Sequence, residues 1–150
     1  MFYSSCKNKC GSTTCQNGGT CSDNVCVCPT GYSGNACQTG WSTQFVGTYN
    51  CKNENCRPAV TSAGSWQSSI TVDATNGGYT VDISSFDNSP VSVAATVDSF
   101  GNIYINTATG GYGIDGTGLY NPTTQVIDLT YTTYSGGTPF YCNMVMTKIQ

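Results

Sequence analysis

The 150-residue sequence contains no histidine, and only 9% of its residues carry a charge. Without an imidazole, the chain can form neither a histidine-based catalytic triad nor a histidine metal site. It also lacks a cluster of lysine or arginine, and its formal net charge is -3, so it offers no cationic surface to nucleic-acid phosphates. No run of residues approaches the ~18 apolar residues of a membrane-spanning helix. We therefore expect no nucleic-acid partner and no membrane helix.

Cysteine, by contrast, is abundant and unevenly distributed. Seven of the ten cysteines lie between Cys6 and Cys37, and only Cys51, Cys56 and Cys142 follow. This distribution predicts two parts, a short cysteine-rich module and a larger domain with enough hydrophobic residues to fill a core. So many cysteines at such spacings indicate an oxidising compartment, and we expect an extracellular or cell-surface protein.

The predicted organisation has four segments. An N-terminal stub covers residues 1–9, the cysteine-rich module 10–37, a linker of small polar residues 38–44, and a β-domain 45–150. Only five residues, MFYSS, precede Cys6, too few for a complete signal peptide. We expect that the export signal was removed or lies upstream.

The cysteine ladder of the module has the spacing Cys10-x4-Cys15-x5-Cys21-x4-Cys26-x-Cys28-x8-Cys37. A zinc site would need separated C-x2-C pairs and usually histidine, and a thiol redox site would need C-x-x-C. The ladder contains neither pattern. A disulfide framework suits six cysteines in a loop-rich segment too short to build a core. Spacing alone leaves about 15 ways to pair six cysteines.

Two stretches of the ladder resemble the epidermal growth factor-like (EGF-like) family. They are CQNGGTC at residues 15–21 and CVCPTGYSGNAC at residues 26–37. The resemblance covers residues 10–37 and implies the bonds Cys10–Cys21, Cys15–Cys26 and Cys28–Cys37. Calcium-binding members carry acidic and amide groups before the first cysteine, where this chain has CKNK without a carboxylate. We therefore expect neither a metal nor another cofactor.

The stretch FYSSCK at residues 2–7 resembles the end of a bacterial lipoprotein signal, which makes Cys6 a candidate for lipidation. Together with the module and the stretch FVGTY at residues 45–49, it resembles surface lipoproteins of Bacteroidota bacteria. This resemblance implies a bacterial outer surface, with the membrane contacted only through a lipid on Cys6. The alternative is that Cys6 is a half-cystine, since ten cysteines can all pair.

Beyond residue 44 the hydrophobic period is two, which indicates strands. Val81 and Ile83 continue an alternation that starts at Tyr79, and similar runs cover 91–97 and 127–131. Turn signals recur at hairpin spacing, at TNGG (75–78), DNSP (87–90), TGGYG (109–113), YNPTT (120–124) and YSGG (134–137). We predict an all-β domain that forms a small antiparallel meander barrel, with a β-sandwich as the alternative. The stretch FVGTY is similar to the opening of lipocalin-like barrels, which supports the barrel.

Three cysteines lie in this β-domain. Cys142, in the predicted last strand, is expected to bond to Cys56 or to Cys51 near the first strand. If Cys56–Cys142 forms, Cys6–Cys51 becomes available as a fifth bond that ties the stub to the β-domain.

The acidic residues are candidates for a paired-carboxylate hydrolase. They are Asp23, Glu54, Asp73, Asp82, Asp87, Asp98, Asp115 and Asp128. The pattern favours a simpler interpretation, in which Asp82 and Asp128 lie on polar strand faces and Asp87, Asp98 and Asp115 at turns. The glycine-rich run at 110–118 lacks the lysine of a phosphate-binding loop and predicts a bulged hairpin. We expect no catalytic residue and no enzyme activity.

These observations predict a non-catalytic extracellular protein for adhesion or surface structure. It would be lipid-anchored, or it would assemble into a fibre through the module, an exposed strand edge or an unpaired cysteine. The expected partners are a protein or glycan at the cell surface, or copies of the chain itself. The ten tyrosines could form a flat binding patch, or they could simply be residues that suit half-buried strands. The alternative is a small-ligand carrier with a lipocalin-like barrel, which would need an open apolar cavity instead of an interior filled by side chains.

Overall fold

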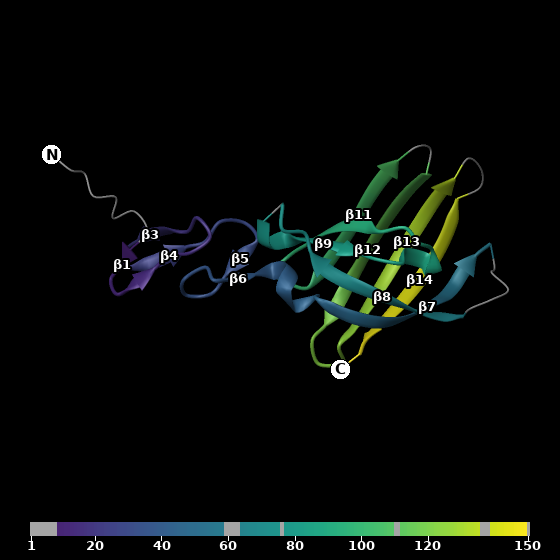
Figure 1. Cartoon of the computed structure of the whole chain (residues 1–150), viewed down its shortest axis with the longest axis horizontal. Helices are drawn as coiled ribbons and strands as arrows, with labels where there is room; N and C mark the ends of the chain where they lie inside the picture. The colour runs from purple at the N-terminus through teal and green to yellow at the C-terminus, as the bar shows by residue number, and fades with distance from the viewer. Residues whose placement is uncertain (1–8, 59–63, 76, 110–111, 136–138, 150) are drawn as a thin grey trace.

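The computed structural model describes residues 9–58, 64–75, 77–109, 112–135 and 139–149. Cys6, the lipidation candidate, lies outside this part of the chain. Figure 1 shows a narrow N-terminal portion that extends from one end of a β-barrel.

The N-terminal portion consists of three short antiparallel hairpins. Their strands are β1 (Lys9–Cys10) with β2 (Thr13–Thr14), β3 (Thr20–Ser22) with β4 (Val25–Val27), and β5 (Tyr32–Ser33) with β6 (Thr39–Gly40). Residues 38–44, the predicted linker, thus contain β6 and a 3-10 helix, η1 (Trp41–Gln44). The chain is hydrogen-bonded through this segment, because Trp41 N–H donates to the carbonyl of Gly31 at 2.9 Å.

The rest of the chain forms a closed antiparallel barrel of eight strands in the order β10-β11-β12-β13-β14-β7-β8-β9. The strands are β7 (Gly47–Arg57), β8 (Ser65–Val72), β9 (Thr80–Ile83), β10 (Val93–Val97), β11 (Asn102–Thr109), β12 (Tyr112–Asn121), β13 (Val126–Ser135) and β14 (Phe140–Lys148). Two further 3-10 helices, η2 (Gly77–Tyr79) and η3 (Phe86–Asn88), flank β9. Each strand pairs with its sequence neighbour, and β14 closes the meander against β7. The predicted all-β barrel is confirmed, and the sandwich alternative is wrong.

Alternation along the strands places one set of side chains inside the barrel. In β10, Val93, Ala95 and Val97 are buried while Ala94 and Thr96 are exposed. The predicted strand boundaries are less accurate, because Val91 is exposed before β10 and Tyr79 lies in η2.

Asp115 lies in the middle of β12, so its predicted position at a turn is wrong. Gly116 and Gly118, which follow it in the strand, occupy inward positions that are too crowded for a side chain. A Cβ at Gly118 would lie 2.7 Å from the carbonyl oxygen of Asp128 and 3.0 Å from Ile103. Glycine therefore lets β12 approach β13 and leaves the interior to the larger neighbouring side chains.

The barrel interior is one continuous hydrophobic cluster with an aromatic pair near each end. Phe45, just before β7, packs on Tyr120 with ring centroids 5.5 Å apart, at the end nearest the N-terminal portion. Phe86, in η3, packs edge-on against Tyr131 at 5.0 Å near the far end. The interior is thus packed with side chains in the described part of the chain.

Candidate functional site

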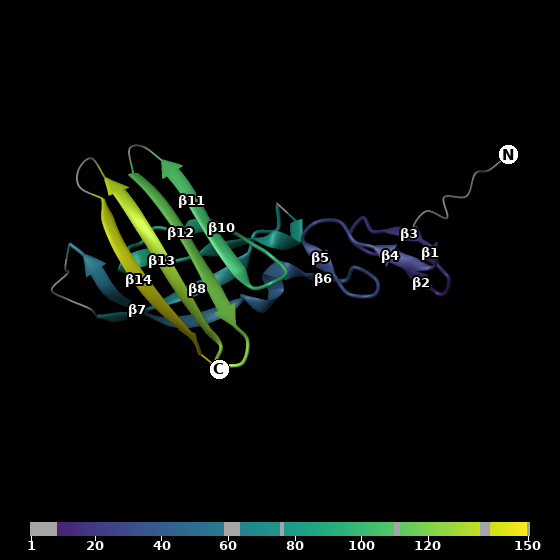
Figure 2. The ribbon, with the colours of Figure 1, turned by 180° about the vertical axis from the view of Figure 1, so that it is seen from behind.

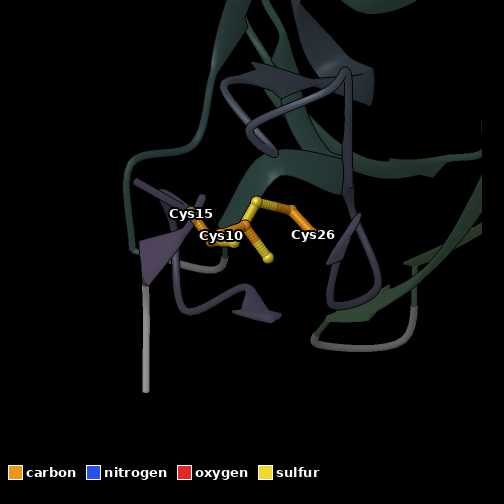
Figure 3. Close-up of side chains that lie close together, drawn as sticks. All are labelled: Cys10, Cys15 and Cys26. Carbon is orange, nitrogen blue, oxygen red and sulfur yellow. A yellow bond between two sulfur atoms is a disulfide. The ribbon is translucent and has the colours of Figure 1, made fainter. Parts of the chain in front are cut away.

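The cysteine-rich module contains three disulfides. Cys10 is bonded to Cys21, Cys15 to Cys26, and Cys28 to Cys37. These are the three bonds that the EGF-like resemblance implies. The first two bonds lie so close together that one sulfur each from Cys10, Cys15 and Cys26 lie within 4.8 Å of one another (Figure 3). A metal binds thiolates, and all three sulfurs are oxidised, so this cluster is a structural staple and not a metal site.

In the barrel, Cys56 is bonded to Cys142, and the alternative bond Cys51–Cys142 does not form. The reason is the pairing of β7 with β14, in which Cys51 lies opposite Met146, four residues along the strand from Cys142. At about 3.4 Å per residue this offset far exceeds the Cα separation that a disulfide spans. A register shift between Tyr141 and Asn143 brings Cys142 to Cys56 instead, with Cα atoms 4.2 Å apart.

Cys51 remains a free thiol and is fully buried inside the barrel. Burial raises the pKa of this thiol to about 11, and hydrogen bonds with Ser68 offset only part of the rise. The thiol is therefore protonated and shielded at neutral pH. The predicted bond Cys6–Cys51 involves a residue outside the described part of the chain.

The module and the barrel meet at a junction built on glycine. Gly78, in η2, is buried, and a Cβ there would overlap the carbonyl oxygen of Gly31 and lie 2.9 Å from Tyr32 Cε1 and from Gly40 Cα. Gly31 has a φ of +95°, and a Cβ at this position would lie 2.7 Å from the Tyr79 ring. Only glycine allows the two backbones to approach this closely.

A polar hollow of about 220 Å³ lies beside this junction. It is lined by Ser33, Thr39, Gly40, Trp41, Thr43, Gln44 and Ser99. The indole nitrogen of Trp41, and the hydroxyl of its neighbour Ser42, are buried without a hydrogen-bond partner among the described residues. The residues that line the hollow carry neither a carboxylate nor a cationic group.

A second groove, of about 210 Å³, lies on the outer face of the barrel and is called the outer groove below. It is lined by Asp73, Thr80, Ala94, Ala95, Thr96, Tyr104, Asn106 and Thr107. It exists because β10 presents small outward side chains beside the large ones of β11; Thr96 lies directly opposite Tyr104 in the ladder. The alternation predicted both strands, but only their pairing shows which tyrosine faces a groove.

The turn that precedes β11 positions Tyr104. Asp98 accepts hydrogen bonds from the Phe100 and Asn102 backbone N–H groups, both at 2.9 Å, and from Asn102 Nδ2 at 2.7 Å. The Tyr104 hydroxyl donates to the same carboxylate at 3.4 Å. Asp98 is therefore a turn residue, as its sequence context predicts, and it also restrains the Tyr104 ring.

These contacts shift the pKa values of Asp98 and Tyr104. Desolvation acts to raise the pKa of Asp98, but the hydrogen bonds from Asn102, Phe100 and Tyr104 outweigh it and lower the pKa below its usual value. Desolvation, and after it the charge of Asp98, raise the pKa of the Tyr104 hydroxyl. At neutral pH the pair is thus a carboxylate and a neutral phenol that donates to it.

Asp87 is also more than a turn residue. It lies in η3 and accepts hydrogen bonds from the Tyr131 hydroxyl at 2.7 Å and from the Asn53 amide. Asp87 and its neighbours Ser85 and Asn88 adopt positive φ values of 53°, 49° and 55°. This local strain is offset by the contacts that hold η3 over the far end of the barrel.

The other predicted acidic positions do not converge. Asp82 and Asp128 lie on the outer faces of β9 and β13, and Asp115 accepts a hydrogen bond from Asn106 at 2.9 Å. The outer groove holds one carboxylate, that of Asp73. The described residues therefore do not place a pair of carboxylates in either of the two hollows.

Comparison with known proteins gives a family match for the cysteine-rich module. The family model of the EGF-like domain matches residues 10–36. No solved structure matches the chain. EGF-like domains are typically extracellular, so the match supports an extracellular location, and the resemblance to Bacteroidota lipoproteins stays a prediction. Among the described residues, no helix is long and apolar enough to cross a membrane.

Proposed function

We propose that this protein is a non-catalytic extracellular surface protein with an adhesive or structural role. In this proposal the cysteine-rich module is a stiff stalk and the barrel is the part presented to partners. The observation that carries the proposal is the glycine junction, because Gly31 and Gly78 join the two parts by close backbone packing. A junction of this kind restricts reorientation far more than a flexible tether would.

We favour attachment through a lipid on Cys6 over assembly into a fibre. Figure 1 shows β1 at the end of the module away from the barrel, so an anchor just before β1 would hold the barrel outward. Two of the routes to a fibre lose support. Each described barrel strand pairs with a neighbour on both sides, so the barrel has no edge strand, and the Cys51 thiol is buried.

The packed interior argues against the carrier alternative. Inward positions carry large side chains such as Tyr49, Tyr131 and Met144, and each is at most 1% exposed. A lipocalin-like carrier would instead leave this volume to its ligand.

The stalk is tested by replacing Gly78 with valine. The added side chain overlaps Gly31, so we expect the Gly78→Val variant to separate the two parts, which then tumble independently. Gly64→Val is the matched control, because Gly64 is exposed and a Cβ there meets no atom within 4 Å. Small-angle scattering and ¹⁵N relaxation report the change. Independent tumbling already in the unaltered protein would overturn the stalk.

The anchor is tested on material purified from its native source. Intact mass and disulfide mapping would show an acyl group on Cys6 if the chain is lipid-anchored. A disulfide on Cys6 would overturn this attachment and leave the stalk geometry as a separate question.

A further inference from the structure

The outer groove has the composition of a sugar-binding site. Its wall is the Tyr104 ring, which is 44% exposed. Its floor is formed by Ala94 and Thr96, whose small outward side chains leave the face of that ring accessible. Ala95 also lines the groove, but its side chain is buried in the barrel. Aromatic rings of this kind bind the apolar C–H face of a pyranose and leave the sugar hydroxyls to polar groups at the edge.

Polar groups of suitable type surround the ring. The groove is also lined by Asp73, Thr80 and Asn106, whose side chains carry a carboxylate, a hydroxyl and an amide. Thr107 lines it as well, but the alternation of β11 places the Thr107 side chain on the inward face with Ile105. The Asn106 amide is oriented by its hydrogen bond to Asp115, as Tyr104 is by Asp98. Carboxylate, amide and hydroxyl groups together supply the acceptors and donors that neighbouring sugar hydroxyls require. Two of the polar side chains are thus preorganised before any ligand binds.

The charge and size of the groove narrow the ligand further. Its lining contains one carboxylate and no cation, and Asp98 and Asp115 lie beside it. A sulfated or carboxylated sugar would meet like charge without a compensating lysine or arginine. The volume of about 210 Å³ is below the range of roughly 300–1,000 Å³ for drug-sized ligands, which suits a single sugar ring.

We propose that the outer groove binds one neutral monosaccharide unit of a surface glycan, with the ring stacked on Tyr104. This inference rests on the proposed adhesive role and names the partner through which the barrel would attach. Because the ligand is small, we expect dissociation constants on the order of 1 mM for isolated monosaccharides. Avidity from several copies on a surface would strengthen attachment without new contacts.

The test is an NMR titration of the ¹⁵N-labelled full chain with the methyl glycosides of glucose, galactose, mannose and N-acetylglucosamine. Methyl glucuronide is the anionic comparison. We expect at least one neutral glycoside to shift the amide signals of Thr96, Tyr104 and Asn106. Methyl glucuronide should bind at least tenfold more weakly than its neutral counterpart.

Variants locate the site. Tyr104→Ala should weaken binding at least tenfold, and Asn106→Ala should weaken it severalfold. Tyr104→Phe keeps the ring and should retain most of the affinity. Tyr134→Ala is the matched control, because Tyr134 is 45% exposed on β13 and does not line the groove. The amide spectrum of each variant reports whether the barrel remains folded.

Three results would overturn the proposal. The first is that no neutral glycoside shifts the amide signals of the groove at a concentration about 50-fold above the expected dissociation constant. The others are equal or tighter binding of methyl glucuronide, and a loss of binding in Tyr134→Ala equal to that in Tyr104→Ala. None of these results depends on the stalk. A negative titration with a rigid Gly78 junction would reject the sugar site alone, whereas a flexible junction in the unaltered protein would reject the stalk alone.

Discussion

The two parts of this protein are stabilised in different ways. The cysteine-rich module buries a cluster made of Cys10, Cys15, Cys26 and Cys37, while Val25 and Val27 are 65% and 54% exposed. The barrel buries a large cluster of aliphatic and aromatic side chains and contains a single disulfide in its described part. A segment of fewer than about 40 residues cannot bury enough apolar surface to offset its conformational entropy, so covalent bonds replace a core.

The comparison extends to how each part meets its surroundings. Figures 1 and 2 show the module as a narrow series of hairpins and the barrel as a broad surface in which β11 to β14 lie side by side. The module extends the molecule in one direction, and the barrel provides a broad surface at its end. This difference in shape agrees with the proposed stalk, in which the module carries the barrel.

Loss of a disulfide in the cysteine-rich module should have the largest effect on folding. Replacing Cys15 and Cys26 together with alanine removes one of three bonds and should unfold the module, because one native disulfide contributes about 2–5 kcal/mol to a small domain. The amide signals of residues 10–37 should lose their dispersion while those of the barrel persist. A module that stays folded would show that its few non-cysteine contacts suffice.

Loss of the barrel disulfide should have a smaller consequence. Cys56 and Cys142 are 86 residues apart, and the loop-entropy model gives an upper limit of about 4.6 kcal/mol for their bond. We expect the double alanine variant to lose most of this free energy of unfolding in urea and to keep the barrel fold. Cys51→Ala is the control, since it removes a buried sulfur but no bond and should cost about 1 kcal/mol. Complete unfolding of the double variant would show that strand pairing does not close the barrel unaided.

The smallest effect concerns Asp98. Its pKa is lowered in the folded state, so its stabilising contribution is present above the unfolded pKa of about 3.9 and is lost as the pH falls through the lower folded value. The stability difference between the unaltered protein and Asp98→Asn should therefore shrink as the pH is reduced from 5 to 2. Urea unfolding at several pH values measures it, with Asp128→Asn as a control for net charge. A difference that does not change with pH would contradict the role of the charge.

The fold class could be predicted from local patterns. Alternation at Ile127, Leu129 and Tyr131 marks a strand with one buried face, and the structure buries all three. Positions at strand ends were less predictable, because Tyr79 and Val91 have the residue type of a strand but lie in connections. Their local sequence does not specify where hydrogen bonding to the next strand stops.

The site was less predictable than the fold. The abundance of tyrosine suggested a binding patch, but Tyr104 and Tyr134 are equally exposed and only Tyr104 lies beside the small side chains of β10. The run of small residues at 94–96 beside the larger residues at 104–106 is the signal that could have identified the groove. Its use requires the register of the two strands.

The all-β character of the barrel and the disulfide framework of the module could be predicted from local sequence, because side-chain alternation and cysteine spacing are properties of neighbouring residues. The pairing of the module cysteines was implied by the EGF-like resemblance. Three further features depend on tertiary packing: the closure of the meander through β14 and β7, the bond between Cys142 and Cys56, and the burial of Cys51 as a thiol. These outcomes depend on the register between strands about 90 residues apart and on one irregularity between Tyr141 and Asn143. Long-range register is set by the packing of the whole barrel, which no local segment contains.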